Sequence, residues 1–123
     1  MNHATVLSKK YIIKSNKLYS GKIIEEEMVK VLVNLGDRLN YKGKIMGHLK
    51  AIAIAGENYI QMSVTSPPDI NIKAGPGWYE KESNILELTV NIIIFGFTKL
   101  QLEKYLQDSM TRIIEGSTII SGR

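Results

Sequence analysis

The chain has no cysteine, only three prolines and no long hydrophobic run. Without cysteine it can form no disulfide, no thiolate nucleophile, no CxxC redox motif and no cysteine-ligated zinc site. Its longest apolar run, Ile92–Phe97, falls far short of the roughly 20 residues that a membrane-spanning helix needs. No apolar segment follows a basic start at the N-terminus. The sequence therefore predicts a protein with no membrane partner and no visible export signal, for which a cytoplasmic location fits.

The excess of positive charge is concentrated in the first half of the chain. Sixteen Lys and Arg against twelve Asp and Glu give a formal net charge of +4. Residues 1–50 hold ten basic and four acidic groups, whereas residues 51–123 hold six and eight. An anionic ligand or a nucleic acid would favour the first half. The other interpretation is a lysine-rich surface that keeps the protein soluble.

Length and composition indicate one folded domain over residues 1–123. A chain of 123 residues is close to the commonest domain size and has no room for a second core. Its 44% hydrophobic and 23% charged residues argue against a disordered or coiled-coil chain.

Apolar residues that recur every three or four positions predict a first helix over residues 21–41. Ser20 is placed as its N-cap, and Gly43 is placed to end it in a left-handed cap. A second helix is predicted to open at Lys99, because Thr98 and Gln101 have the spacing of a capping box. This second helix is expected to end at residue 116.

Four segments have the pattern of strands: residues 4–14, 47–55, 58–65 and 85–95. The second and third form a predicted hairpin in which Ala55 opposes Asn58. Residues 66–83 show little pattern apart from a possible short edge strand near Ile72. The predicted order is β-α-β-β-(long loop)-β-α, an α+β two-layer sandwich with a mainly antiparallel four-stranded sheet and both helices on one face.

The face of the sheet away from the helices is the predicted binding surface. It gathers mostly polar side chains: His48, Lys50, Tyr59, Gln61, Ser63, Thr65, Glu87, Thr89 and Asn91. An apolar group is expected at its end, formed by Ile52, Ile54, Ile93 and Phe95, which a second copy or the long loop would cover. Ligand binding is assigned to Lys50, Tyr59 and Gln61, and the alternative is a simple solvated sheet face.

A catalytic role is considered for His48, whose titration near neutral pH suits a general acid or base. Glu87 would orient it if their strands are neighbours, and Lys50 would hold an anion beside it. A structural histidine is the competing interpretation. No spacing of His, Asp or Glu resembles a metal-ligand set, so no metal site is predicted, and no cofactor is indicated.

The segment Gly75–Tyr79 places two aromatic residues beside a turn. Its glycines do not have the spacing of a phosphate-binding loop. Either the loop folds over a ligand that contacts Trp78 and Tyr79, or Trp78 anchors the loop to the core.

Three functional hypotheses follow. The first is a small oligomeric binding or regulatory domain whose sheet face or Trp78 loop holds a small anionic ligand or a protein partner. The second is RNA binding through basic residues such as Lys9, Lys10 and Lys14, which is not favoured because few aromatic side chains face outward for base stacking. The third is a small enzyme that uses His48.

Overall fold

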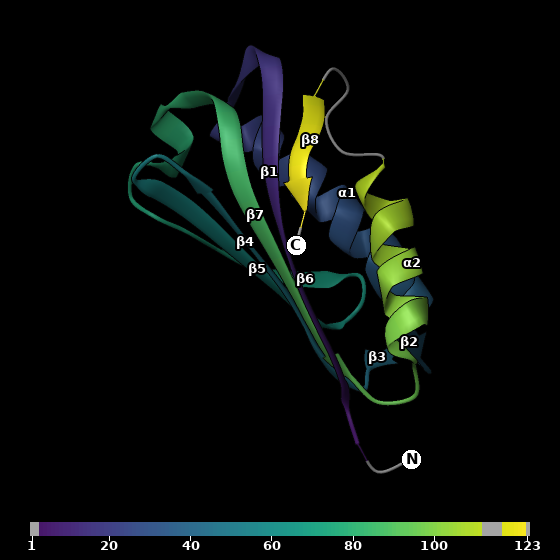
Figure 1. Ribbon diagram of the computed structural model, residues 1–123. Coiled ribbons are helices and arrows are strands. Elements are labelled where there is room, and N and C mark those ends of the chain that lie inside the picture. Colours follow the sequence, from purple (N-terminus) through teal and green to yellow (C-terminus); the bar gives the residue numbers. More distant parts are fainter. Residues whose placement is uncertain (1–2, 112–116, 123) are drawn as a thin grey trace.

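A strongly twisted antiparallel sheet carries two helices on one face (Figure 1). The structure, a computed structural model, describes residues 3–111 and the backbone of residues 117–122. Within these residues the main sheet has six strands in the order β6-β5-β4-β7-β1-β8, and β2 and β3 form a separate short hairpin. The elements are β1 Thr5–Ser20, α1 Gly21–Leu39, β2 Asn40–Tyr41, β3 Lys44–Ile45, β4 Gly47–Ala55, β5 Asn58–Ser66, β6 Asp69–Ala74, the 3-10 helix η1 Trp78–Glu80, β7 Glu82–Ile94, α2 Lys99–Met110 and β8 Ser117–Gly122.

The predicted α+β class, antiparallel sheet and pair of helices are confirmed, but the strand count is not. The sheet has two strands more than the predicted four. One is β6 at the sheet edge, which pairs with β5 and confirms the short edge strand expected near Ile72 within the long loop. The other is β8, which pairs with β1.

The β4–β5 hairpin has the predicted register. Ala55 lies opposite Asn58, and the pairing continues without a break to Leu49 opposite Val64. Gly56 in the turn has a positive φ of 62°. Because side chains alternate along a strand, this register buries one side chain of every two against the helices. On β4 the buried side chains are those of Leu49, Ala51 and Ala53.

The two longest strands, β1 and β7, are neighbours in the sheet. They pair from Thr5 opposite Ile94 to Lys14 opposite Ile85. From Leu86 onward the inward side chains of β7 are buried beneath the helices: Leu86, Leu88, Val90, Ile92 and Ile94. At the start of β4, Gly47 (φ 152°) lies so close to β7 that an added Cβ would be 1.8 Å from the carbonyl oxygen of Ile93.

Both predicted helix starts are confirmed. The Ser20 hydroxyl accepts a hydrogen bond from the backbone N–H of Ile23 at 3.2 Å. Thr98 and Gln101 form the expected capping box at the start of α2. No helix in the described part of the chain is both long enough and apolar enough to cross a membrane.

The predicted helix ends are wrong or lie outside the described residues. Helix α1 ends at Leu39, because the Asn40 side chain donates to the carbonyl of Asp37 and accepts from the N–H of Gly43. Lys42 (φ 53°) and Gly43 (φ 85°) then form the two-residue turn between β2 and β3. Helix α2 ends at Met110, and residues 112–116 lie outside the described residues.

The segment after β6 is attached to the start of α1 by Trp78. Its ring is only 2% exposed, and its indole N–H donates to the carbonyl oxygen of Gly21 at 2.9 Å. Gly21 has no room for a side chain, since a Cβ there would lie 2.2 Å from the backbone oxygen of Trp78. The geometry is that of an aromatic anchor.

Replacing this anchor should destabilise the fold. Trp78→Ala removes a fully buried ring and leaves the Gly21 carbonyl without its donor, so we expect the free energy of unfolding to fall by about 3–5 kcal/mol. The measurement is urea unfolding followed by circular dichroism. Tryptophan fluorescence cannot be used, because Trp78 is the only tryptophan and the variant lacks it. Leu100→Ala, at a site 78% exposed, is the control and should change stability by less than about 0.5 kcal/mol. An equal loss of unfolding free energy in the two variants would show that Trp78 does not anchor the segment.

Candidate functional site

One row of polar side chains crosses five strands on the open face of the sheet, the face away from the helices. From β6 to β1 the row consists of Asn71, Ser63, Lys50, Asn91 and Ser8, each paired in register with the next. Antiparallel partners on one face lie about 5 Å apart, so neighbouring side chains in the row can act on the same ligand.

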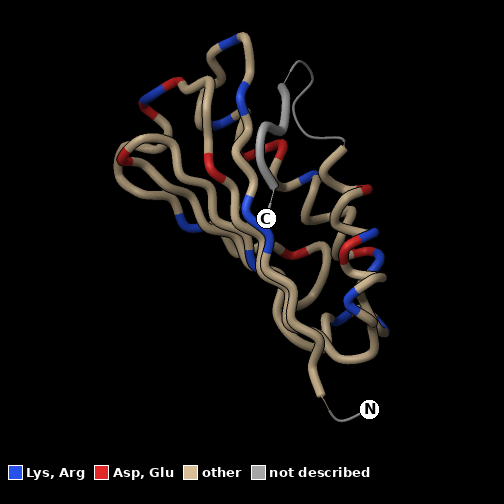
Figure 2. Tube along the Cα trace, viewed as in Figure 1, with Lys and Arg blue, Asp and Glu red and all other residues tan. Residues whose placement is uncertain are grey.

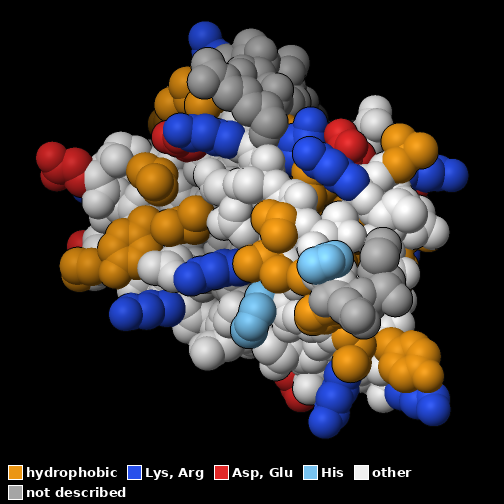
Figure 3. Space-filling view, turned by 60° about the horizontal axis from the view of Figure 1, so that its bottom comes forward, with side chains coloured by type: hydrophobic (Ala, Val, Ile, Leu, Met, Phe, Trp, Pro, Cys, Tyr) orange, Lys and Arg blue, Asp and Glu red, His pale blue; other side chains and the backbone are white. Residues whose placement is uncertain are grey.

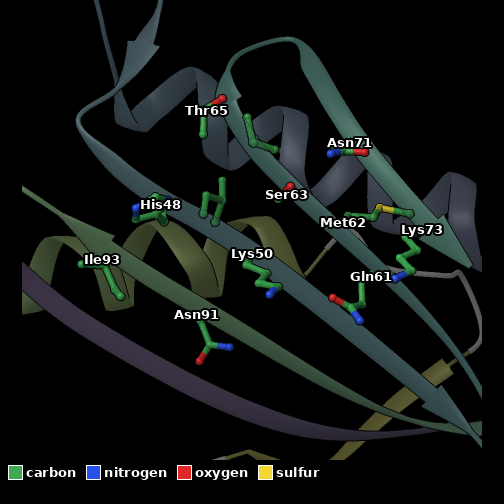
Figure 4. A pocket seen from close by; sticks show the side chains of 12 residues that line it. His48, Lys50, Gln61, Met62, Ser63, Thr65, Asn71, Lys73, Asn91 and Ile93 are labelled. Atoms are coloured by element: carbon green, nitrogen blue, oxygen red, sulfur yellow. The ribbon is translucent and has the colours of Figure 1, made fainter.

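A shallow, half-open hollow of about 590 Å³ lies over β6, β5, β4 and β7 along this row (Figure 4). Its volume is within the range of small-molecule sites. The polar side chains that line it are His48, Lys50, Gln61, Ser63, Thr65, Asn71, Lys73 and Asn91. The lining therefore contains two lysines, one histidine and no carboxylate.

Lys50 and Lys73 flank the hollow from either side of β5. Lys73 lies opposite Gln61, and Lys50 lies opposite Ser63, the next outward residue on β5. Strand spacing places their Cα atoms about 12 Å apart. Both lysine side chains are long enough to reach one anion bound between them. Neither ammonium group forms an ion pair with any residue that the structure describes. Figure 4 shows the Gln61 amide between them.

Asn91 adds an oriented donor. The Ser8 hydroxyl donates to Asn91 Oδ1 at 2.7 Å, which turns the oxygen toward β1. The Asn91 amide nitrogen then points to the side of Lys50 and Gln61 (Figure 4). Two ammonium groups and a positioned N–H₂ group make the hollow a surface of hydrogen-bond donors.

The residues predicted to bind ligand fall into three places. Lys50 and Gln61 line the hollow. Tyr59 lies further along β5, where its ring packs over Gly75 so closely that a Cβ on that glycine would be 2.7 Å from Tyr59 Cε1. Trp78 is buried beside α1. Tyr59 and Trp78 therefore do not contact the same ligand.

Tyr79 also belongs to the helix side of the molecule. Its hydroxyl donates to the carboxylate of Glu25 on α1, which in turn forms an ion pair with Lys22 at 3.3 Å. Ligand binding by Trp78 and Tyr79 stays a prediction from the sequence, and the hollow does not include them.

His48 and Glu87 are not brought together. Strands β4 and β7 are neighbours, but His48 lies opposite Ile93, whereas Glu87 lies opposite Ile54. Six residues of β4 separate the two positions, about 20 Å. Glu87 forms an ion pair with Lys10 instead. No group of three or more His, Asp or Glu side chains in the described residues is placed to hold a metal ion.

The expected apolar group at one end of the open face is in fact two groups. Ile52 and Ile54 lie toward the β4–β5 turn, whereas Ile93 lies beside His48 and Phe95 beyond it, at the opposite end. The polar row through Lys50 runs between them. Similarly, the basic residues of the first half do not share one surface, because Lys9 is near Glu103 of α2 at 4.0 Å and the next residue, Lys10, points to the open face.

Three residues of the site were missed by the sequence reasoning: Ser8, Asn71 and Lys73. The signal for the last two was present in the segment 69–74. If Ile70 and Ile72 face the core, Asn71 and Lys73 must face outward. Ser8 required the register of β1 against β7.

Comparison with models of protein families, with curated proteins and with solved structures found no match.

The hydrogen bond between Tyr79 and Glu25 makes a testable prediction about pH. It favours the protonated phenol and, with partial desolvation, raises the pKa of Tyr79 above its usual 10.0. The folding stability that this bond contributes is therefore fully present below pH 10.0 and is lost as the pH rises through the raised pKa. Glu25→Gln should lower the pKa of Tyr79, whereas Glu26→Gln on the neighbouring residue should not.

The measurement is ultraviolet titration of tyrosinate, in which each protein is compared with its Tyr79→Phe counterpart to isolate this phenol. A Tyr79 pKa that Glu25→Gln leaves unchanged would show that the hydrogen bond does not form in solution.

Proposed function

We propose that this protein is a non-enzymatic binding domain that holds a small anionic ligand, with carboxylate or phosphate groups, in the hollow of its open sheet face. The single observation that carries the proposal is the lining: two unpaired lysines, an oriented amide donor and no carboxylate. A neutral or cationic ligand would leave those ammonium groups uncompensated.

Three physical features support an anion in particular. Charge-assisted hydrogen bonds to ammonium groups are stronger than neutral ones. Two carboxylates of the open face lie near the hollow but outside its lining: Glu87, which forms an ion pair with Lys10, and Asp69, two residues before Asn71 on β6. The hollow also has an apolar border at Ile93, and the core lies directly behind the strands that form its floor, which limits the water around the ligand and strengthens these interactions.

The other two hypotheses have less support from the geometry. The enzyme hypothesis loses its partner for His48, since Glu87 is about 20 Å away along the strands. RNA binding through one basic surface is weakened because Lys9 and Lys10 point to opposite faces.

The experiment is an amide-resolved NMR titration of the full chain with inorganic phosphate and, separately, with citrate. We expect saturable shifts at Lys50, Gln61, Asn91 and Lys73. Lys50→Gln should weaken binding about tenfold, the loss of one charge-assisted hydrogen bond. Lys104→Gln removes the same charge from the exposed face of α2 and should leave affinity unchanged.

Two results would overturn the proposal. One is the absence of saturable shifts at these four residues with both anions. The other is an equal loss of affinity in Lys50→Gln and Lys104→Gln, which would indicate nonspecific charge attraction. Native mass spectrometry of the purified protein would then report the mass of any retained molecule.

A further inference from the structure

Exposed large apolar side chains gather at two opposite ends of the molecule. At the end where β1 and β4 begin and β7 stops, here called the lower end, Val6, Met46, Ile93 and Phe95 are each between 41% and 58% exposed. They are contiguous: Val6 and Ile93 are paired, and the Phe95 N–H donates to the carbonyl of Met46 at 3.0 Å. Figure 3 turns this end toward the viewer and shows hydrophobic side chains beside both histidines.

The second set lies where β1 ends, α1 begins and β7 starts, here called the upper end. Its members Leu18, Ile23, Tyr79 and Ile85 are between 42% and 59% exposed. The ends are separated by the length of the two longest strands (Figure 1). Clustered exposure of this kind marks association surfaces in soluble proteins.

The charge at the lower end has one sign. Its three segments, residues 3–8, 40–48 and 93–100, contain Lys42, Lys44 and Lys99 and no Asp or Glu. None of these lysines forms an ion pair with a residue that the structure describes. Two lower ends placed face to face would therefore repel each other.

The upper end carries the exposed carboxylates. Glu57 lies on the β4–β5 turn, and Glu80 and Glu82 lie on either side of Lys81, at η1 and the start of β7 (Figure 2). These three glutamates have no ion pair among the described residues. The upper segments, residues 14–26, 54–58 and 77–86, hold five carboxylates and four lysines in total. Their balance is thus slightly acidic, opposite to that of the lower end.

From these two observations we infer that the protein binds a second copy of itself head to tail, the lower end of one copy against the upper end of the next. Apolar surface is then covered on both partners, and lysines meet glutamates, whereas pairing of two lower ends is penalised by like charge. Such a heterologous contact repeats, so it produces a ring if the rotation closes and a filament if it does not. The inference does not rest on the proposed anion site, although the hollow and the lower end share Ile93.

The test uses two variants of the full chain, each blocked at one end. Phe95→Asp places a carboxylate in the lower apolar set, where it would face glutamates, and Ile85→Lys places an ammonium group in the upper set, where it would face lysines. Both sites are exposed, and circular dichroism checks that the fold is kept. Size-exclusion chromatography with light scattering should show an oligomer for the wild type and a monomer for each variant alone.

Mixing the two variants is the decisive step. Phe95→Asp retains an intact upper end, and Ile85→Lys retains an intact lower end, so an equimolar mixture should form a heterodimer of twice the 13.8 kDa monomer mass. Native mass spectrometry with one variant isotopically labelled should show one copy of each. Gln107→Asp, an added carboxylate on the exposed side of α2, should assemble like the wild type.

Three results would overturn the inference. A monomeric wild type at high concentration removes self-association altogether. A wild-type oligomer that Phe95→Asp abolishes and Ile85→Lys leaves intact indicates symmetric association through the lower end. A mixture that stays monomeric shows that the two ends do not bind each other.

Discussion

The antiparallel pairing of β1 with β7 is the constraint on which the rest of the structure depends. These are the two longest strands, and their register decides for ten consecutive pairs which side chain faces the helices and which faces outward. The inward half forms the centre of the core with Leu88, Val90 and Ile92. The outward half is mostly polar in the middle, and its apolar side chains at the two ends are exposed. Because one residue of slip would exchange the two faces, burial of the core also fixes the composition of the open face.

Much of the fold was predictable because local signals act within a few residues. The caps at Ser20 and Thr98 satisfy backbone donors of their own helices, and the β4–β5 register follows from a short turn between two alternating strands. The end of α1 was not predictable from apolar periodicity, since it depends on the Asn40 side chain, which offers the backbone an alternative to another helical turn.

The candidate site was predictable only in part, and the reason is the order of strands. Alternation along a strand gives the face of each residue but not its neighbour on the next strand. Lys50 and Gln61 could be placed together because a hairpin joins their strands. The distance between His48 and Glu87 depended on how β4 is aligned with β7, a contact between segments far apart in sequence. The contribution of Lys73 depended on the existence of β6.

Gly47 is a position where a requirement of backbone packing could be mistaken for a requirement of binding. Its φ of 152° is positive, and an added Cβ would lie 1.8 Å from the carbonyl oxygen of Ile93, so this position excludes any side chain. The glycine stands next to His48, which lines the hollow, and next to Met46 of the lower end. In a survey of all single substitutions, replacements of Gly47 would therefore be deleterious, although the neighbouring positions are candidate binding residues. That intolerance reports the close approach of β4 to β7, so variation at His48 and Met46, whose side chains are exposed, is the more informative record of selection on binding.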